Sequence, residues 1–145
     1  MTKVYDAPFP QNPRTGSPVF KDAVAMGVVN EPSNTQLLFT AGPEGAVLTG
    51  LWAIPCGTVP ATGLYLFRAP AGAGVKKYFI DSEAMPALAT FSTAAKISKV
   101  KFAEYSELST LRLGPGESLH GGIGVACPNG VVFFVQESEY DDETA

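Results

Sequence analysis

The clearest pattern in the chain is a series of short apolar stretches separated by turn residues, spanning residues 35–70. Residues 36–41, 47–54 and 64–68 each have the length and hydrophobicity of a β-strand. Between the first two lies the sequence Gly-Pro-Glu-Gly (42–45), whose glycines can take positive φ angles at no steric cost. The pattern predicts three consecutive strands, around which the rest of the chain is organised.

The middle strand of these three is apolar on both faces. Uninterrupted alternation would group Val47, Leu51 and Ala53 on one face, and Leu48, Trp52 and Ile54 on the other. A strand that is apolar on both faces is expected to be covered on both. We therefore expect residues 47–54 to lie centrally in the fold.

The remaining strands are predicted from shorter stretches of the same kind: residues 19–29, 75–80, 96–103, 110–113, 118–127 and 131–137. Residues 81–95 are irregular, with room for a short helical turn that Asp81 or Ser82 would cap. Asn129-Gly130 favours a tight hairpin between the last two strands. Eight or nine short strands about ten residues apart predict an all-β, antiparallel two-sheet sandwich of jelly-roll-like type.

The length of 145 residues suits one domain, which we place at residues 18–138. Residues 1–17 contain several prolines, which lack a hydrogen-bond donor for a sheet. They are expected to form an extended N-terminal arm laid over the domain or over a neighbouring subunit, or else to be a disordered terminus. Val4, Tyr5 and Phe9 are the apolar residues of this arm and the candidate partner-binding residues.

Residues 139–145 form the predicted acidic tail. Five of the fourteen acids lie within the last nine residues, so the rest of the chain carries nine acids against ten bases. Such a body has no basic face of the kind that binds nucleic acid. The acidic end lacks the glycine-turned loop of an EF-hand, so a solvated tail is preferred over a calcium site. Lys96, Lys99 and Lys101 are interpreted as guards of an edge strand, with Val100 and Phe102 facing inward.

The sequence also indicates in which cellular compartment the protein is made. No stretch approaches the ~20 apolar residues of a membrane span. The first twenty residues, with Asp6 and four prolines, do not resemble a signal peptide. Cys56 and Cys127 are too few for a disulfide scaffold, and in a reducing cytosol we expect two free thiols.

Candidate chemistry centres on His120, the only histidine. The sequence His-Gly-Gly-Ile-Gly (120–124) superficially matches the oxyanion loop of lipases, but the chain has no Gly-x-Ser-x-Gly elbow. Cys127 would lie roughly 23 Å from His120 along one straight strand. We therefore interpret His120 as a structural histidine at a strand edge, and the glycines as a bulge or a close backbone approach. No catalytic, cofactor-binding or metal-binding residues are predicted, and the protein is not expected to be an enzyme.

Several segments together resemble a known class of protein. They are LLFTAG (37–42), PCGT (55–58), LYLFR (64–68), FIDSEAMPALATFST (79–93) and LRLGPGESL (111–119), with Tyr140 near the end. Over about residues 35–140 the chain resembles small β-sandwich virion proteins of tailed bacteriophages, commonly head-decoration (cement) proteins. The resemblance implies synthesis in the bacterial cytoplasm, a place on the capsid surface, binding to the major capsid protein, and often a trimer.

The leading hypothesis is therefore a non-enzymatic capsid decoration protein that binds the outside of the head and stabilises joins between major capsid protein subunits. A tail or baseplate component is the first alternative. A carbohydrate-binding sandwich is the second, with Trp52, Tyr65 or Tyr78 as stacking platforms, although core packing is favoured for Trp52. Self-association is expected because the aromatic residues outnumber what one small core needs: Phe67, Tyr78, Phe79, Phe91, Phe133 and Phe134. The choice of a homotrimer comes from the resemblance and from the three-fold joins of an icosahedral shell.

Overall fold

The computed structural model describes residues 12–139, except residues 73, 75, 95 and 107. These residues form ten strand segments and no helix, so no described helix could cross a membrane. The segments are β1 (Asn12–Gly16), β2 (Val19–Phe20), β3 (Gln36–Thr40), β4 (Ala46–Pro55), β5 (Thr62–Ala69), β6 (Tyr78–Met85), β7 (Val100–Lys101), β8 (Leu111–Leu113), β9 (Ser118–Ile123) and β10 (Val131–Glu139). The all-β class predicted from the alternation is confirmed.

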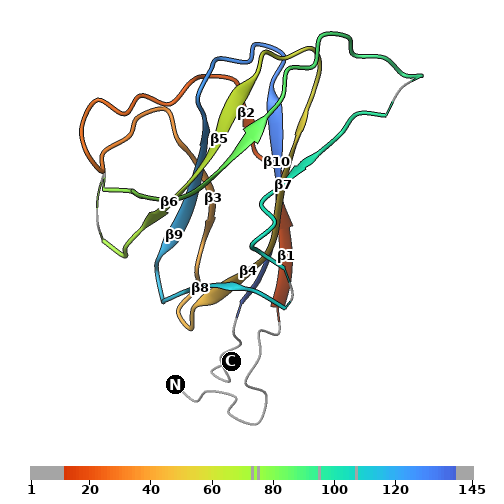
Figure 1. Cartoon of the computed structure of the whole chain (residues 1–145). Coiled ribbons are helices and arrows are strands. Elements are labelled where there is room, and N and C mark those ends of the chain that lie inside the picture. The colour runs from red at the N-terminus through yellow and green to blue at the C-terminus, as the bar shows by residue number, and fades with distance from the viewer. Residues whose placement is uncertain (1–11, 73, 75, 95, 107, 140–145) are drawn as a thin grey trace.

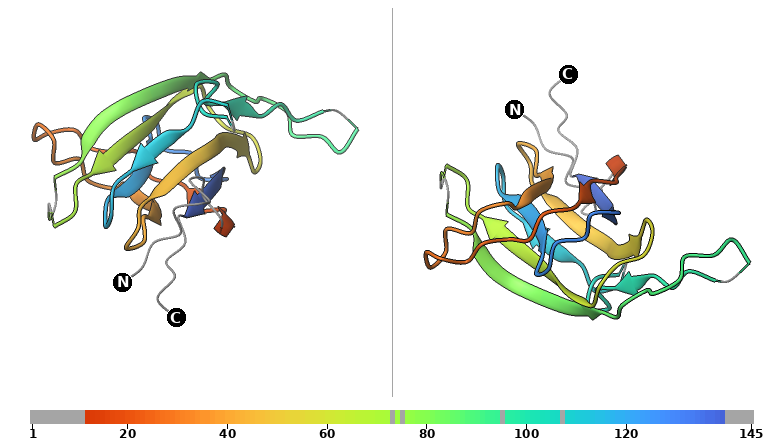
Figure 2. Two further views of the ribbon diagram at one scale, coloured as in Figure 1. Left: turned by 90° about the horizontal axis from the view of Figure 1, so that it is seen from below. Right: turned by 90° about the horizontal axis from the view of Figure 1, so that it is seen from above.

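Two antiparallel sheets pack face to face (Figures 1 and 2). The four-stranded sheet has the order β3-β9-β5-β6. In the six-stranded sheet, β1 and β2 lie along the same side of β10, and β8 and β7 lie along the same side of β4. β1 shares one strand position with β2, and β7 shares one with β8, so the ten segments occupy eight positions. Numbered along the chain, these positions have the order 1-8-3-6 in the six-stranded sheet and 2-7-4-5 in the four-stranded sheet. This is a jelly roll, so the predicted sandwich is confirmed.

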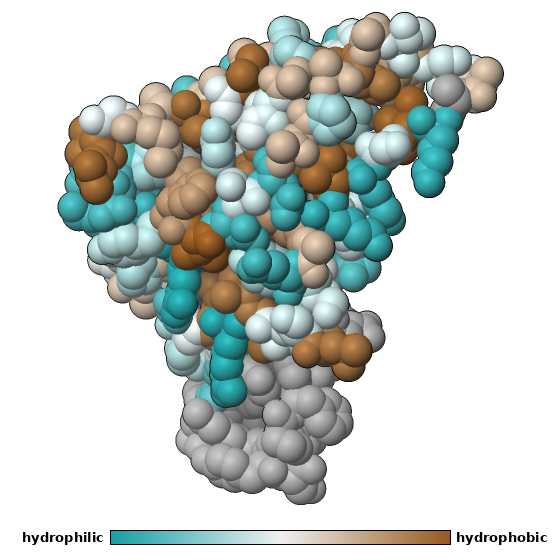
Figure 3. Space-filling model, in the orientation of Figure 1, coloured by the Kyte–Doolittle hydropathy of each residue, from teal (hydrophilic) through white to brown (hydrophobic). Residues whose placement is uncertain are grey.

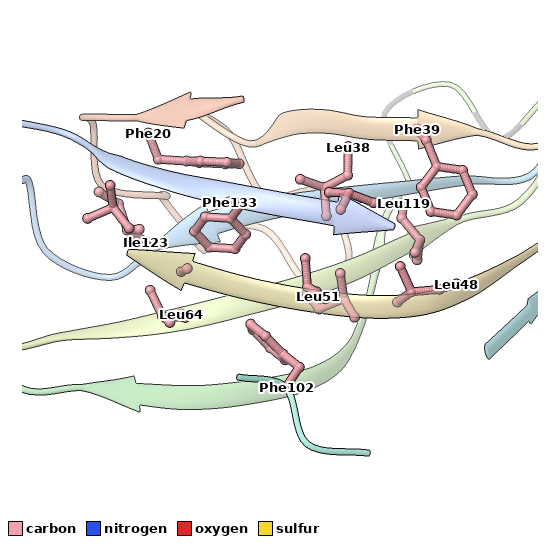
Figure 4. Packing of buried hydrophobic residues seen from close by; sticks show 14 of the residues in the cluster. Phe20, Leu38, Phe39, Leu48, Leu51, Leu64, Phe102, Leu119, Ile123 and Phe133 are labelled. Carbon is pink, nitrogen blue, oxygen red and sulfur yellow. The ribbon is translucent and has the colours of Figure 1, made fainter. Parts of the chain in front are cut away.

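The core lies between the two sheets, and both contribute to it (Figure 4). Phe20 of β2 and Phe133 of β10 are fully buried, with their ring centres 4.3 Å apart. The other large side chains that are fully buried in this core are Phe102, Leu48, Leu51, Leu64, Leu66, Leu113, Leu119, Ile123 and Val131. Each such side chain contributes about 1.5–3 kcal/mol by leaving water, which makes this layer the main source of stability.

Strand β4 is central as predicted, between β10 and β7/β8, but its alternation is broken. Gln136 pairs with Gly50 and Glu137 with Leu48, so Thr49 is an extra residue that forms a β-bulge. Because of the bulge, Leu48 faces the core on the same side as Leu51. The predicted grouping of Leu48 with Trp52 was therefore wrong.

Strand β6 differs from the prediction of a strand at 75–80 followed by a helical turn. Residues 78–85 pair with β5 from Arg68↔Tyr78 to Thr62↔Met85. The Asp81 carboxylate does accept a hydrogen bond from the Ser82 backbone N–H, at 2.8 Å, but without starting a helix. A helical turn would leave this edge of β5 unpaired, so ladder hydrogen bonds outweigh the local cap.

Five residues of the predicted arm also form a strand. Residues 12–16 are β1, which pairs with β10 from Asn12↔Glu139 to Gly16↔Val135. The strand accommodates Pro13 because β1 lies at the edge of the sheet, where a missing donor is tolerated. Residues 1–11, with Val4, Tyr5 and Phe9, and residues 140–145 of the tail lie outside the described residues.

Candidate functional site

Part of the outer face of the four-stranded sheet is covered by residues 21–35, which we call the flap. The Val24 backbone N–H donates to the Ile123 carbonyl at 2.8 Å, which ties the flap to β9. Ala25 and Ser33 exchange two backbone hydrogen bonds, so the flap folds back on itself as a small hairpin. The sequence predicted a strand or a pair of strands over residues 19–29. The alternation there belongs to β2 and to a loop that packs on the sheet.

Glycines in and just after β9 let the flap and a tyrosine approach the sheet closely. A Cβ atom on Gly122 would lie 2.1 Å from Val24 Cγ1, and one on Gly124 would lie 2.9 Å from the Tyr65 hydroxyl oxygen. Real Cβ contacts are not this short, so a side chain at either position would force Val24 or Tyr65 to shift. The predicted close backbone approach is confirmed.

Three aromatic rings pack together beneath the flap. The ring centre of Phe79 lies 5.7 Å from that of Tyr65 and 5.8 Å from that of Phe67. Phe67 is fully buried although it faces away from the main core, whereas Phe79 is half exposed. Beside the rings is a hollow of about 410 Å³, lined by Val24, Met26, Tyr65, Phe79 and Gly124. A second hollow, of about 700 Å³, also borders Tyr65, and its lining residues include Thr62, Ser82 and Glu83.

Exposed hydrophobic side chains gather at the flap tip and on the first half of β6, and they can be followed in Figure 3. The two segments are adjacent because the Lys77 N–H donates to the Asn30 carbonyl at 2.8 Å, and Lys76 pairs with Glu31 at 3.2 Å. We call this set the apolar flap surface: Met26, Val28, Val29, Tyr78, Phe79 and Ile80, between 36% and 82% exposed.

The outer face of the six-stranded sheet is different. Trp52 and Phe134 are half-buried neighbours on β4 and β10, stacked with ring centres 5.7 Å apart. The Lys99 amine lies 5.0 Å from the Trp52 ring centre, in a cation–π contact. The prediction that Trp52 packs in the core was wrong, because its place in the alternation turns it outward.

Next to this aromatic pair is a hollow of about 330 Å³ that we call the lysine hollow, lined by Ile54, Lys96, Ile97, Ser98, Lys99 and Lys101. It adjoins β7, which lies at the edge of the sheet, as predicted for a lysine-guarded strand. Val100 is half-buried and Phe102 is buried, while Lys99 and Lys101 are exposed. The predicted inward and outward faces are confirmed.

His120 lies in the middle of β9, between β3 and β5, and not at a strand edge as predicted. Its Nε2 atom is 3.0 Å from the Ser118 hydroxyl oxygen. Burial, together with the charge of Lys77, lowers the pKa of His120 from 6.5 to about 4. The imidazole is thus neutral and a weak base near pH 7. Ser118 was missed from the sequence, although two residues at i and i+2 of one strand share a face.

The two cysteines are free thiols. Cys56 is exposed and Cys127 is buried, and burial raises the pKa of the Cys127 thiol. The Cys127 thiol donates to the Val125 carbonyl, with a sulfur–oxygen distance of 3.3 Å. A thiol with a raised pKa is a poor nucleophile, because the thiolate is the reactive form.

One buried carboxylate lies at the end of the sandwich where β1 begins. Arg14 pairs with Glu137, at 3.1 Å, and with Glu139. Burial raises the pKa of Glu137 to about 7; the Glu139 charge adds to this, and Arg14 opposes it. No hydrogen-bond partner is described for Glu137 Oε2. Among the described residues, no three acidic, cysteine or histidine side chains come together as metal ligands.

The partner-binding residues predicted from sequence, Val4, Tyr5 and Phe9, lie outside the described part of the chain. Of the proposed stacking platforms, Tyr65 lies between the two hollows, Tyr78 is exposed on β6, and Trp52 is capped by Lys99. No family model matches the chain, and neither a curated protein nor a solved structure is detectably similar to it.

Proposed function

We propose that the protein is a non-enzymatic capsid decoration protein of a bacteriophage, which binds the outside of the head and stabilises joins between major capsid protein subunits. Support comes from the sequence resemblance over residues 35–140 and from the jelly-roll topology, which many viral capsid domains share. Because one fold hosts many functions, the proposal depends mainly on a surface of this molecule.

That surface is the apolar flap surface. Large exposed apolar side chains that gather on one part of a domain are typical of a partner-binding site. Here they belong to β6 and to a flap that backbone hydrogen bonds to β9 and to Lys77 hold in place, so the surface is preformed. A preformed surface loses little conformational entropy on binding. Repeated over a shell, many such modest contacts act together and resist expansion of the head.

The direct test uses particles of the phage that encodes the protein. Mass spectrometry and cryo-electron microscopy of purified virions should find the protein on the head, at a fixed ratio to the major capsid protein. Deleting its gene should lower the temperature at which heads release DNA, and added purified protein should restore that temperature. Absence from the virion would refute the proposal, and a location on the tail would replace it with the baseplate alternative.

The apolar flap surface is tested by substitution within the same assay. Val28→Asp with Val29→Asp should abolish co-sedimentation with heads that lack the protein, because both side chains are exposed and contact no core. Leu108→Asp is the matched control, since Leu108 is fully exposed but lies between β7 and β8. Equal loss of binding in the control would remove the surface from the proposal.

The predicted arm residues are tested separately. Replacing Val4, Tyr5 and Phe9 with serine should weaken binding to heads without changing the melting temperature, since the prolines around them disfavour a place in the sheet. The same variants decide whether the contact is with the capsid or with a second copy. Sedimentation equilibrium on the free protein would show loss of the expected homotrimer only in the second case.

One observation favours the carbohydrate-binding alternative. The hollow of about 700 Å³ combines the Tyr65 ring with the exposed side chain of Ser82, which lies opposite Tyr65 on β6. An aromatic face beside hydrogen-bonding groups is suited to a sugar ring. Glycan-array binding that is lost in Tyr65→Ala and kept in Tyr78→Ala would establish this function.

A further inference from the structure

Strand β6 is the last strand of the four-stranded sheet, so one of its edges pairs with no described strand. In both views of Figure 2 it forms the outer boundary of that sheet. Its eight residues include neither lysine nor proline, which commonly guard an exposed edge. A bulge at Ile80 interrupts only the first half, so residues 81–85 are a regular stretch. We call the unpaired side of this stretch the free edge.

The backbone groups at the free edge belong to Ser82 and Ala84. The Gly63 carbonyl accepts a hydrogen bond from the Gly124 N–H at 2.9 Å, so Gly63 points its backbone groups away from β6. Its partner Ala84 therefore points its own groups to the free edge, and so does Ser82, two residues earlier. In agreement, the Ser82 N–H donates to the carboxylate of its neighbour Asp81 and not to β5.

The two faces of this stretch differ in chemistry. On the outer face, Ser82 and Ala84 are exposed and border the hollow of about 700 Å³ beside Tyr65. On the inner face, Asp81 and Glu83 lie opposite two core leucines of β5 and are half-buried. A strand added at the free edge would thus have uncharged neighbours on one face and carboxylates on the other.

The two carboxylates lack a cation. None of the ion pairs between described residues includes Asp81 or Glu83. The buried Oδ2 atom of Asp81 also has no hydrogen-bond partner. Because Asp81 and Glu83 are two residues apart on one face, basic residues at positions i and i+2 of an added strand would lie directly opposite them.

A second copy of β6 does not have this chemistry. If Ser82 of one copy paired antiparallel with Ala84 of the other, the two Glu83 carboxylates would be directly opposite each other. If Ser82 paired with Ser82, each Asp81 would be opposite a Glu83. Like charges directly opposite destabilise a sheet, so self-pairing at the free edge is disfavoured.

We propose that the free edge of β6 binds an extended segment of a partner protein, in which two basic residues alternate with uncharged ones. The basic residues lie opposite Asp81 and Glu83, and the uncharged ones opposite Ser82 and Ala84, beside the hollow. Backbone hydrogen bonds supply affinity and the alternating side chains supply specificity. The inference concerns residues 81–85, outside the apolar flap surface, and does not depend on the protein being a virion component.

The probe is the synthetic peptide acetyl-Thr-Val-Lys-Val-Lys-Thr-amide, whose valines would pair antiparallel with Ser82 and Ala84. A fluorescent form should bind the full-length protein saturably, as measured by anisotropy. Methylating the two valine amide nitrogens should weaken binding about tenfold or more, because these donors face β6. Methylating the two lysine amides should have little effect, because they face away. A peptide of the same composition with adjacent lysines is the control for charge alone.

The protein side of the contact has two readouts. On addition of the peptide, hydrogen exchange measured by NMR should slow at the Ser82 and Ala84 amides, which face the free edge. Glu83→Lys should weaken binding of the lysine peptide about two- to fivefold, the effect of one exposed ion pair. The same variant should favour a peptide with glutamate in place of lysine. Asp22→Lys, at an exposed acid of the flap, is the matched control.

Three outcomes would overturn the proposal. The first is the absence of saturable binding by the alternating peptide. The second is equal binding of the alternating peptide and the control with adjacent lysines, which would mean attraction by net charge only. The third is equal weakening by the two methylation patterns, which would show that no strand is added to β6. A failure to bind phage heads, in contrast, would bear only on the proposed function.

Discussion

The two outer faces of the sandwich carry similar residues and have different fates. Each has packed aromatic rings: Tyr65, Phe67 and Phe79 on one, and Trp52 with Phe134 on the other. On the four-stranded sheet the flap folds over the rings, and Phe67 is fully buried. On the six-stranded sheet a single lysine lies over the tryptophan, and both rings are only partly buried. Two faces of similar composition thus differ in how far their aromatic rings are buried.

The difference comes from the glycines of each face and from the side chains that pack against them. The flap can lie against β9 because Gly122 and Gly124 lack side chains. On the other face Gly50 also lacks a side chain, but the space is filled by Gln136, whose Oε1 atom would lie 2.9 Å from an added Cβ. The covered face therefore adds a second small core to the monomer, and the open face leaves its rings accessible to a partner.

The largest expected effect compares two phenylalanines. Phe67→Ala should lower the free energy of unfolding by about 3–5 kcal/mol, the usual cost of removing a fully buried aromatic ring. Phe134→Ala should cost about 1–2 kcal/mol, because a half-buried ring has less to lose. Urea unfolding at neutral pH measures both. Equal losses would mean that the open face is as important to the monomer as the covered one.

The glycine that admits the flap gives the next effect. Gly122→Ala should destabilise the protein by about 1–3 kcal/mol, since the new methyl group overlaps Val24. In a Val24→Ala background the same change should cost less, and a double-mutant cycle isolates that coupling. Gly27→Ala in the flap is the control, because an added Cβ there would meet nothing within 4 Å. Additive losses would contradict the contact.

The covered face should also respond to acid through His120. Because the folded-state pKa of His120 is lowered to about 4 from 6.5, its stabilising effect is full above pH 6.5 and is lost as the pH falls toward 4. The loss should be on the order of 1–2 kcal/mol after allowance for partial exposure. His120→Gln should flatten this part of the stability curve, as measured by urea unfolding at several pH values.

Glu137 acts in the opposite direction and provides the control for that experiment. Its folded-state pKa is raised to about 7, so stability falls as the pH rises from 4.5 to 7. Glu137→Gln should remove this second slope and leave the first intact. If the loss of stability at acid pH persisted in His120→Gln but disappeared in Glu137→Gln, that loss would have to be assigned to Glu137 instead of His120.

The smallest expected effect belongs to the open face. Lys99→Gln removes the cation from the Trp52 ring and should cost about 0.5–1 kcal/mol, the value of an exposed cation–π contact. The emission of Trp52 should change, and an uncharged quencher should reach the ring more easily. Lys101→Gln is the matched control on the same edge. An unchanged emission spectrum would place Lys99 away from the ring in solution.

Features of the fold that depend on neighbours along the chain could be predicted from the sequence, and features that depend on contacts between distant segments could not. Strand positions and the edge lysines are set by neighbours along the chain, so alternation alone located β3, β4, β5 and β10. The bulge at Thr49 was missed because it depends on how β10 pairs across the sheet. The fit of Val24 onto Gly122 joins segments about 100 residues apart, and periodicity contains no record of it.

The candidate sites show the same limit. The glycines after His120 signalled a close approach, but not what approaches. The three lysines were interpreted only as guards of an edge, because the apolar walls that make them a hollow come from Ile54 on another strand as well as Ile97. Asn30 and Asn34 both have a φ of 61°, in the left-handed region that asparagine tolerates better than most residues. These two asparagines were the sequence clue to the turns of the flap.

The pairing of Asn12 with Glu139 has a mechanical consequence. If both ends of the chain were pulled apart, β1 would peel away from β10 one residue pair at a time, and the hydrogen bonds would break in sequence under low force. If the N-terminal end alone were anchored and the load applied at the distal loops, the pairs from residues 12 to 16 would be strained together, in shear. The same strand is thus a weak zipper or a strong tether, according to where the load enters.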